Sequence, residues 1–175
     1  MFQPELADAL QEKHPLLAEE YRKHKDTPNL CFKRCKYHLL GMQYNSDANN
    51  LARNGVKYKP FAKFRAKSVK VLFIYDVQHR KLIPEWKHEN GWTNVWYRVD
   101  KYTFADWWDA SDVDDVCTHG IHFYLSLIAA ICYITYFNGN NNFQDSGVCV
   151  SAPTRYQMEN ATSEREPNWY RKKIF

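Results

Sequence analysis

The stretch that decides the fold reads Ser68-Val69-Lys70-Val71-Leu72-Phe73-Ile74-Tyr75-Asp76-Val77. Alternate residues of a β-strand point to opposite faces, so this stretch presents two faces. Both faces are apolar: one carries Val69, Val71, Phe73 and Tyr75, and the other carries Leu72 and Ile74. Apolar residues on both faces are typical of a strand inside a sheet. We therefore predict a central strand over this stretch.

The segments after this strand carry turn and strand signals. Residues 78–81 predict a hairpin connection to a short strand over 82–86, because polar residues separate two apolar runs. Asn90-Gly91 predicts a tight turn before a strand near 95–99. Residues 103–116 are rich in Asp and are interpreted as a structured loop.

A central strand is also predicted from Cys117 to Phe123. Its Gly120 has no side chain, so the backbone can approach a neighbour closely there. Ser126 is a suitable N-cap for a helix over 127–137, and that helix carries no charge, which favours burial. Residues 30–44, earlier in the chain, also have a strand-like pattern.

The N-terminal segment, residues 4–25, has helical periodicity. Its apolar residues recur at helical spacing, at Leu6, Leu10, Leu17 and Tyr21. Pro15 cannot donate a hydrogen bond to the preceding turn, so it ends one helix and begins another. The segment is therefore predicted to form a helical pair.

These elements together predict an α+β fold, with a mostly antiparallel twisted sheet, one buried helix and an N-terminal helical pair. The predicted organisation is an N-terminal helical extension over 1–27, an α+β domain over 28–152 and a C-terminal arm over 153–175. The 175 residues are enough for one domain with a substantial core.

Aromatic residues are abundant, at 16% of the chain with 6 Trp and 12 Tyr. So many large rings are hard to bury completely in a small domain, and we expect some of them to be exposed or to contact a partner. The formal net charge of +4 favours acidic partners only mildly.

The 5 cysteines form no regular disulfide framework, and their number is odd. No basic and apolar leader opens the chain, and the apolar run over 121–137 fits a buried helix better than a membrane span. We therefore expect synthesis in a reducing host cytoplasm, free thiols and no membrane span, and the sequon at Asn160 is then not glycosylated.

One candidate metal site is formed by Cys117, His119 and His122, because thiolate and imidazole are the usual zinc ligands. Further ligands could come from Cys31, Cys35 and His38. The spacing matches no standard zinc pattern, and in a strand His122 points away from the other two. The alternative is that these are packed core residues, and no cofactor is expected.

A basic run over 57–67 contains aromatic residues between its cations, including Lys59, Lys63, Arg65 and Lys67. Such a run could bind phosphates through its cations and stack bases on its rings. The alternative is a strand with a solvent-exposed basic face and an apolar core face. Trp169 and Tyr170 near the C-terminus are further candidate contact residues.

The five aspartates of the stretch 106–115 could hold calcium, but solvated loop charge is the alternative, and their spacing is not that of a helix–loop–helix site. No phosphate loop, dinucleotide motif or Gly-x-Ser-x-Gly motif is present in the sequence. The sequence therefore predicts no catalytic residue.

Two segments carry a resemblance to a known family. They are Ala66-Lys67-Ser68-Val69-Lys70-Val71-Leu72-Phe73-Ile74-Tyr75 and Val116-Cys117-Thr118-His119-Gly120-Ile121-His122-Phe123-Tyr124-Leu125. Together they resemble an uncharacterised domain of giant viruses and related large DNA viruses, often attached to pentapeptide repeats, with a Cys-x-x-Gly-Ile-His-Phe motif. No activity is assigned to that domain, so the resemblance implies no catalytic residue.

A looser likeness concerns Gly120-Ile121-His122-Phe123-Tyr124 and the helix after it. This outline is similar to the Gly-Ile-Tyr-Phe strand and helix of ADP-ribosyltransferases, but the His-Gly motif that contacts nicotinamide in that fold is missing. The likeness therefore bears on topology and not on activity.

The resemblance and the excess of rings predict a structural or interaction protein of a large DNA virus, a minor capsid component that binds other virion proteins. Its expected location is the virion. Two alternatives stay open: a metal-dependent or ADP-ribosyltransferase-like enzyme, and a nucleic-acid-associated basic module.

Overall fold

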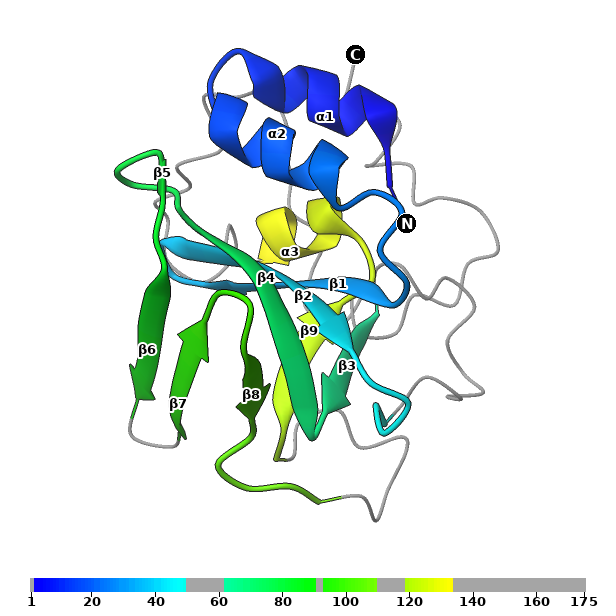
Figure 1. Ribbon diagram of the computed structural model, residues 1–175, viewed down its shortest axis with the longest axis vertical. Coiled ribbons are helices and arrows are strands. Elements are labelled where there is room, and N and C mark those ends of the chain that lie inside the picture. The colour runs from blue at the N-terminus through cyan, green and yellow to red at the C-terminus, as the bar shows by residue number, and fades with distance from the viewer. Residues whose placement is uncertain (1, 50–61, 91–92, 110–118, 134–175) are drawn as a thin grey trace.

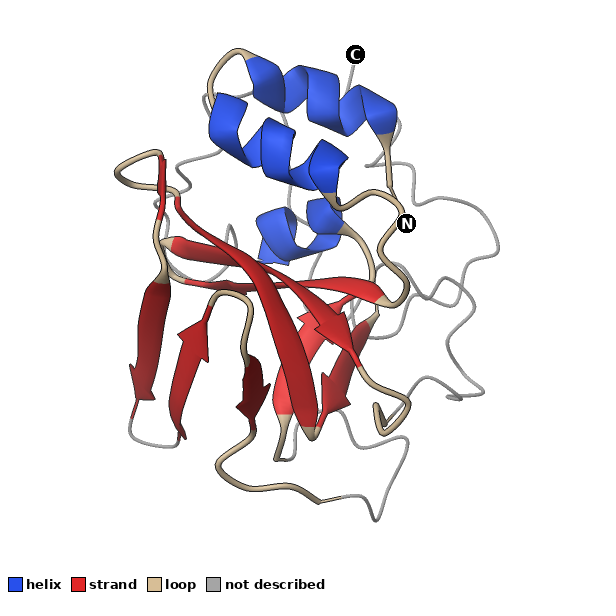
Figure 2. Cartoon of the chain, viewed as in Figure 1, coloured by secondary structure: helices blue, strands red, loops and turns tan. Residues whose placement is uncertain are grey.

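The computed structural model describes residues 2–49, 62–90, 93–109 and 119–133 (Figures 1 and 2). The described part is an α+β fold in which a curled antiparallel sheet has helices packed against it, as the sequence predicts. Its helices are α1 (Pro4–Gln11), α2 (Pro15–Lys23) and α3 (Leu127–Tyr133). Its strands are β1 (Leu30–Cys35), β2 (His38–Tyr44), β3 (Lys63–Ala66), β4 (Ser68–Asp76), β5 (Lys81–Leu82), β6 (Glu85–Asn90), β7 (Thr93–Arg98), β8 (Tyr102–Phe104) and β9 (Ile121–Tyr124).

The main sheet has the strand order β3-β9-β1-β2-β4-β5, and β8 pairs with β4 on the same side as β5. Strands β6 and β7 form a separate two-stranded sheet. Every strand pair in the described ranges is antiparallel. Strand β4 therefore has neighbours on both edges, which confirms the predicted central strand.

The predicted faces of β4 are wrong in one respect. Val69 and Val71 do share an inner core, but Phe73 and Tyr75 belong to a second core on the helix side of the sheet. The register between β2 and β4 shifts after Gly41, which pairs with Phe73. A bulge of this kind changes the face to which later residues point.

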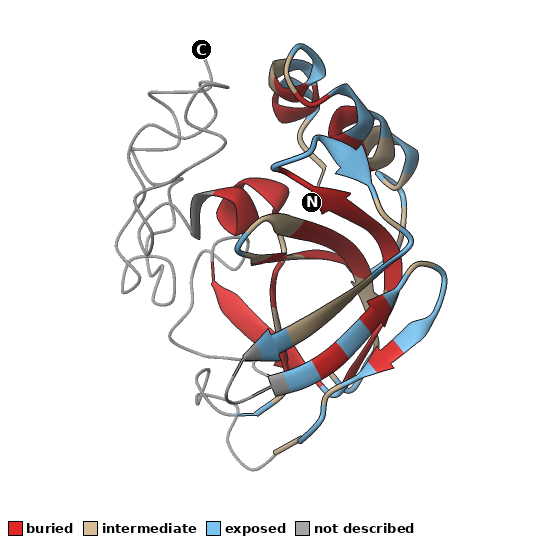
Figure 3. Ribbon diagram, turned by 90° about the vertical axis from the view of Figure 1, so that its left-hand side faces the viewer, coloured by how far each residue is buried: buried red, intermediate tan, exposed pale blue. Residues whose placement is uncertain are grey.

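Two cores lie on the two faces of the sheet. The helix-side core contains Leu6, Leu10, Leu17 and Tyr21 of the helical pair, Phe32, Phe73 and Tyr75 of the sheet, and Leu127 to Ile131 of α3. The inner core lies within the curl of the sheet and includes Val69, Val71, Phe64, Phe123, Val95 and Tyr97. Figure 3 shows the helices turning their buried sides toward the sheet.

The helical pair forms as the sequence predicts. Pro4 and Pro15 stand at the first positions of α1 and α2, where a missing N–H is tolerated. The apolar stripe lies against the sheet, and the ring of Tyr21 packs edge-on against Phe32 with centroids 5.7 Å apart. The Tyr21 hydroxyl also accepts a hydrogen bond of 2.9 Å from the Gln3 backbone N–H, which ties the start of α1 to α2.

The strand predicted over 117–123 is described from His119 onward, where β9 spans Ile121–Tyr124, so it begins after Gly120 and ends one residue later than predicted. Gly120 has a φ of 130°, and a Cβ added there would lie 2.9 Å from the Trp108 ring and 3.3 Å from the Ala66 carbonyl oxygen. The hydroxyl oxygen of Ser126 accepts a hydrogen bond of 3.3 Å from Ala129 N–H, so it caps α3 as expected. The predicted helix beyond Tyr133 and the C-terminal arm lie outside the described residues.

The prediction of a loop over 103–116 is wrong at its start. Tyr102 to Phe104 form β8, and they pair with Lys70, Val69 and Ser68 of β4. The edge of β4 supplies the pairing partner for this three-residue strand, so its formation depends on a distant segment of the chain. Residues 110–118 lie outside the described part of the chain.

Stability should fall with acid because of His14, which links the helical pair to the sheet. Its Nδ1 lies 3.0 Å from the Tyr75 hydroxyl, and the residue is 1% exposed. Burial first, and then the nearby cations, lower the pKa of His14 from 6.5 to about 4. The unfolded chain therefore binds a proton over a pH range in which the folded chain does not, so stability is complete above pH 6.5 and falls toward pH 4.

We expect urea unfolding to show a loss of up to about 3 kcal/mol from this group as the pH drops through that range, since one pKa unit corresponds to about 1.4 kcal/mol. His14→Asn keeps a polar group near Tyr75 but does not titrate. Its unfolding free energy should depend less steeply on pH than that of the parent chain. Identical slopes for the two proteins would rule out His14 as the cause.

Candidate interaction surface

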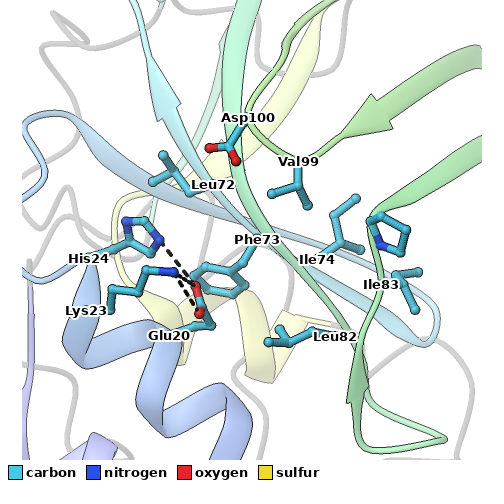
Figure 4. Close-up of a pocket in the computed structure, with 11 residues that line it drawn as sticks. Glu20, Lys23, His24, Leu72, Phe73, Ile74, Leu82, Ile83, Val99 and Asp100 are labelled. Atoms are coloured by element: carbon cyan, nitrogen blue, oxygen red, sulfur yellow. Dashed lines mark hydrogen bonds and ion pairs between the residues drawn. The ribbon is translucent and has the colours of Figure 1, made fainter.

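A pocket opens between α2 and the middle of β4. It has a volume of ≈ 370 Å³, and Figure 4 shows its lining side chains. The apolar lining is Leu72, Phe73 and Ile74 of β4, Leu82 of β5, Ile83 and Pro84 after it, and Val99. The polar residues are Glu20, Lys23 and His24 at the end of α2, and Asp100 across from them. An apolar floor with a few polar groups at the rim is typical of a binding pocket.

On the α2 side of the rim, Glu20 has polar contacts with Lys23 in α2 and with His24 just after it. The Lys23 Nζ lies 3.1 Å from Glu20 Oε1, and His24 Nε2 lies 3.3 Å from Glu20 Oε2. His24 also stacks on Phe73, with ring centroids 6.0 Å apart. Glu20 is thus held in place by these two neighbours, and α2 forms a stable wall of the pocket.

The opposite side of the rim is a tight turn between β7 and β8. Asp100 has a φ of 63°, and its N–H donates to the Val71 carbonyl at 2.9 Å. The Asp100 carboxylate is exposed, and among the described residues it has no hydrogen bond or ion pair. It is therefore available to a positively charged partner group.

Next to the pocket, β7 and β8 expose three large rings, which we call the aromatic face: Trp96 (45% exposed), Tyr102 (56%) and Phe104 (63%). Strand alternation explains their exposure. Val95, Tyr97 and Thr103 are buried, so the residues next to them in each strand point outward. The Thr103 hydroxyl donates to the Trp96 carbonyl at 2.9 Å, which places the two strands side by side.

Three lysines flank the aromatic face without ion pairs in the described residues: Lys67, Lys70 and Lys101. Lys70 pairs with Tyr102 in the β4–β8 register, and the Lys67 carbonyl accepts the Ala105 N–H at 2.9 Å. Trp96 is different, because Lys87 and Arg98 lie against its ring at 5.7 and 5.1 Å from the centroid. The surface therefore combines apolar rings with unpaired positive charge.

The pocket and the aromatic face follow one another along β4. Phe104 pairs with Ser68 and Tyr102 with Lys70, and the next outward residue of β4, Leu72, lines the pocket beside Asp100. At about 3.3 Å per residue, the step from Ser68 to Leu72 covers roughly 13 Å. The aromatic face and the pocket are thus neighbours on one continuous surface, with the projecting rings at one end and the recess at the other.

The histidines of the candidate metal site do not line the pocket. His119 is exposed and stacks on Trp107 with centroids 3.9 Å apart, while His122 pairs with Arg65 in the β3–β9 register. Cys117 lies outside the described residues. Within the described part of the chain, no three His, Cys, Asp or Glu side chains are grouped so that they could hold a metal ion.

The further residues proposed for that site are also dispersed. Cys31 lies in the inner core, and His38 stacks on Trp86. The Cys35 Sγ lies 3.9 Å from His88 Nδ1, but burial raises the pKa of Cys35 and lowers the pKa of His88 to about 4. Thiol and imidazole are therefore both neutral near pH 7, so this pair does not supply a thiolate nucleophile.

The basic strand differs from the expected solvent-exposed face. Lys63 is 5% exposed and Arg65 is fully buried, whereas Lys67 is exposed. The Arg65 guanidinium donates to the backbone carbonyls of Asp109 and His119 instead of meeting solvent. Lys59, Trp169 and Tyr170 lie outside the described residues.

The described part of the acidic stretch has structural roles. The Asp106 carboxylate accepts hydrogen bonds from the N–H groups of Asn94, at 3.0 Å, and Trp107, at 2.9 Å. The Asp109 carbonyl binds Arg65. The remaining three aspartates of the stretch lie outside the described residues.

Sequence reasoning missed Tyr102, Phe104, Lys70 and the pocket. The alternation of Tyr102, Thr103 and Phe104, two rings around a β-branched residue, is the signal that indicates a strand with one aromatic face. The pocket has no comparable signal, because its walls come from three distant parts of the chain: α2, β4 to β5, and the β7–β8 turn.

None of the described helices has the length and apolar character that a bilayer crossing needs. In comparisons with known proteins, no curated protein and no solved structure matches the chain. A family model described as a family of unknown function, DUF5758, matches residues 20–130. The match runs from α2 into α3 and includes every described strand. The chain therefore belongs to the DUF5758 family.

Proposed function

We propose that this chain is a structural and interaction protein, a minor capsid component of a large DNA virus, which binds neighbouring subunits through the aromatic face and the adjacent pocket. The observation that carries the proposal is the exposure of Trp96, Tyr102 and Phe104 on one side of two adjacent strands. Exposed rings gathered on one face mark contact sites on soluble domains, because water solvates them poorly.

The chemistry of the surface suits protein contact. Trp and Tyr are enriched among the residues that dominate binding energies, and they act best when they fill recesses on a partner. The pocket supplies the converse feature, an apolar recess that accepts a partner's side chain. A flat surface of solvated charges would offer neither projecting rings nor an apolar recess to a partner.

The viral setting has separate support, from the resemblance of residues 66–75 and 116–125 to a domain of large DNA viruses. In this proposal the protein is made in the host cytoplasm and is carried in the virion. Helix α3 is the buried helix of the domain, and α1 and α2 form an outer pair that packs against the sheet through Leu6, Leu10, Leu17 and Tyr21. The arm predicted over 153–175 is proposed as a further contact with neighbouring subunits.

The alternative functions have less support. Of the four basic residues proposed for nucleic acid, Lys63 and Arg65 are buried and only Lys67 is exposed among the described ones. An enzymatic role has no favourable arrangement in the described ranges, because His119 and His122 do not line the pocket and the Cys35–His88 pair is neutral.

The test is incorporation into virions. We expect mass spectrometry of purified virions to detect the protein, and we expect the double substitution Tyr102→Ser, Phe104→Ser to reduce its amount at least about tenfold, since two contact rings are lost. Leu16→Ser is the matched control, because Leu16 is an exposed apolar residue of α2 (38% exposed) outside the surface. Absence of the protein from virions, or equal incorporation of the double variant, would defeat the proposal.

A further inference from the structure

The interaction surface has both halves of a contact on one molecule. At one end, the rings of Tyr102 and Phe104 project from β8, and at the other end the pocket recedes between α2 and the β7–β8 turn. Both ends lie on the same side of β4, about 13 Å apart. A surface that carries a projection and a matching recess can bind a second copy of itself.

The unpaired charged groups of the surface also differ between its ring end and its pocket end. Lys67 and Lys70 accompany the projecting rings and are unpaired in the described residues. The carboxylates of Glu20 and Asp100 lie at the recessed end, and Asp100 has no partner group among the described residues. At the recess Lys23 pairs with Glu20 at 3.1 Å, so the unpaired charge of the pocket lining is the carboxylate of Asp100. The unpaired charges beside the projecting rings are the cations of Lys67 and Lys70.

We infer that this surface joins two copies of the chain in a two-fold symmetric dimer, an inference that rests on the proposed function. A two-fold axis reverses the direction of β4 between the copies, so the ring end of each copy faces the pocket end of the other. Phe104 of each copy enters the opposite pocket, and Lys67 approaches the opposite Asp100. Because the dimer is symmetric, the contact of Phe104 with the pocket and the contact of Lys67 with Asp100 each occur twice.

The pocket suits a side chain as its occupant. Its volume of ≈ 370 Å³ is near the lower end of the range of roughly 300–1,000 Å³ for ligand pockets. The floor of Leu72, Phe73 and Val99 offers apolar contact to a phenyl ring. A nucleic acid suits the surface less well, because the unpaired carboxylate of Asp100 repels phosphates at the pocket end.

The test is sedimentation equilibrium of the purified full chain over a wide range of concentration, at low and high salt. We expect a monomer–dimer equilibrium that weakens as salt rises, because part of the contact is between opposite charges. Phe104→Ser should raise the dimer dissociation constant about 30-fold, because the substitution removes one contact of about 1 kcal/mol from each of the two copies. Leu16→Ser should leave the constant unchanged, and circular dichroism should show that both variants are folded.

A double-mutant cycle tests the orientation. Asp100→Asn keeps a residue that tolerates the positive φ of this position, and Lys67→Gln removes the facing charge. Each single substitution should weaken the dimer, and the double variant should weaken it hardly more than either one, because both remove the same contact. Fully additive effects would show that the two residues do not face each other and would reject the two-fold arrangement.

The inference is overturned if the chain stays monomeric at every concentration, or if a dimer forms that Phe104→Ser leaves intact. Binding of a single-stranded oligonucleotide by a monomer whose affinity depends on Lys67 and Tyr102 would overturn it too. These outcomes are distinct from failure of the proposed function. If the protein is monomeric but still needs Phe104 to enter virions, the dimer inference fails and the proposed function stands. If the protein forms a dimer that depends on Phe104 but is absent from virions, the proposed function fails and the dimer stands.

Discussion

Replacing Arg65 by alanine should destabilise the fold by about 3 to 4 kcal/mol, measured by urea unfolding at neutral pH. The Arg65 side chain is fully buried on β3, and its Nη1 donates to the carbonyls of Asp109 and His119. Its guanidinium also lies over the Trp108 ring, 5.2 Å from the centroid. The substitution leaves two carbonyls short of a donor and opens a cavity, and both effects cost stability.

A control for Arg65→Ala stands two residues further along the chain. Lys67→Ala removes a cation that is exposed and makes no ion pair in the described residues, so we expect a change within about 0.5 kcal/mol when unfolding is measured at a concentration at which the chain is monomeric. Arg65→Lys should fall between the two, because an ammonium keeps a positive donor but not the planar fork of the guanidinium. A loss below about 1 kcal/mol for Arg65→Ala would contradict a structural role for this residue.

Replacing Gly41 by valine should cost about 3 kcal/mol of unfolding free energy, because the core has no room for a side chain there. Gly41 pairs with Phe73 at the place where the register between β2 and β4 shifts. A Cβ at Gly41 would overlap the Phe73 ring, and that ring is buried in the helix-side core. The glycine is thus required by the close approach of the ring.

The double variant Gly41→Val, Phe73→Ala checks this explanation. Phe73→Ala alone should lose about 3 kcal/mol by leaving a cavity. The valine side chain can use that space, so the double variant should lose clearly less than the sum of the two single losses. Additive losses, again from urea unfolding, would mean that the ring is not the group that excludes a side chain at Gly41.

The sequence predicts those elements of the fold that have their own periodicity. The apolar spacing of Leu6, Leu10, Leu17 and Tyr21 predicts the helical pair, and apolar residues on both faces predict the central position of β4. The faces of β4 beyond Val71 could not be predicted, because a register shift after Gly41 is a property of two paired strands. The sequence of either strand alone does not reveal the register shift.

The sequence predicts that the protein exposes some aromatic rings, but it does not predict which ones. The number of rings indicates that some are exposed, and Trp96, Tyr102 and Phe104 are the ones that the structure exposes on one face. The alternating cations of residues 57–67 predict a solvent-exposed basic face. This prediction is wrong for Lys63 and Arg65, because both side chains are buried. Their burial depends on residues that are distant in sequence, such as Trp108 and His119, and no local pattern contains that information.

The central claim is that the aromatic face and the pocket are a protein contact surface. The most direct test is hydroxyl-radical footprinting of the purified chain and of the same chain in intact virions, with oxidation read out at each residue by mass spectrometry. The account predicts that Trp96, Tyr102 and Phe104 are oxidised in the free chain and protected in the virion, while Leu16 reacts equally in both. Equal oxidation of the three rings in the two states would contradict it.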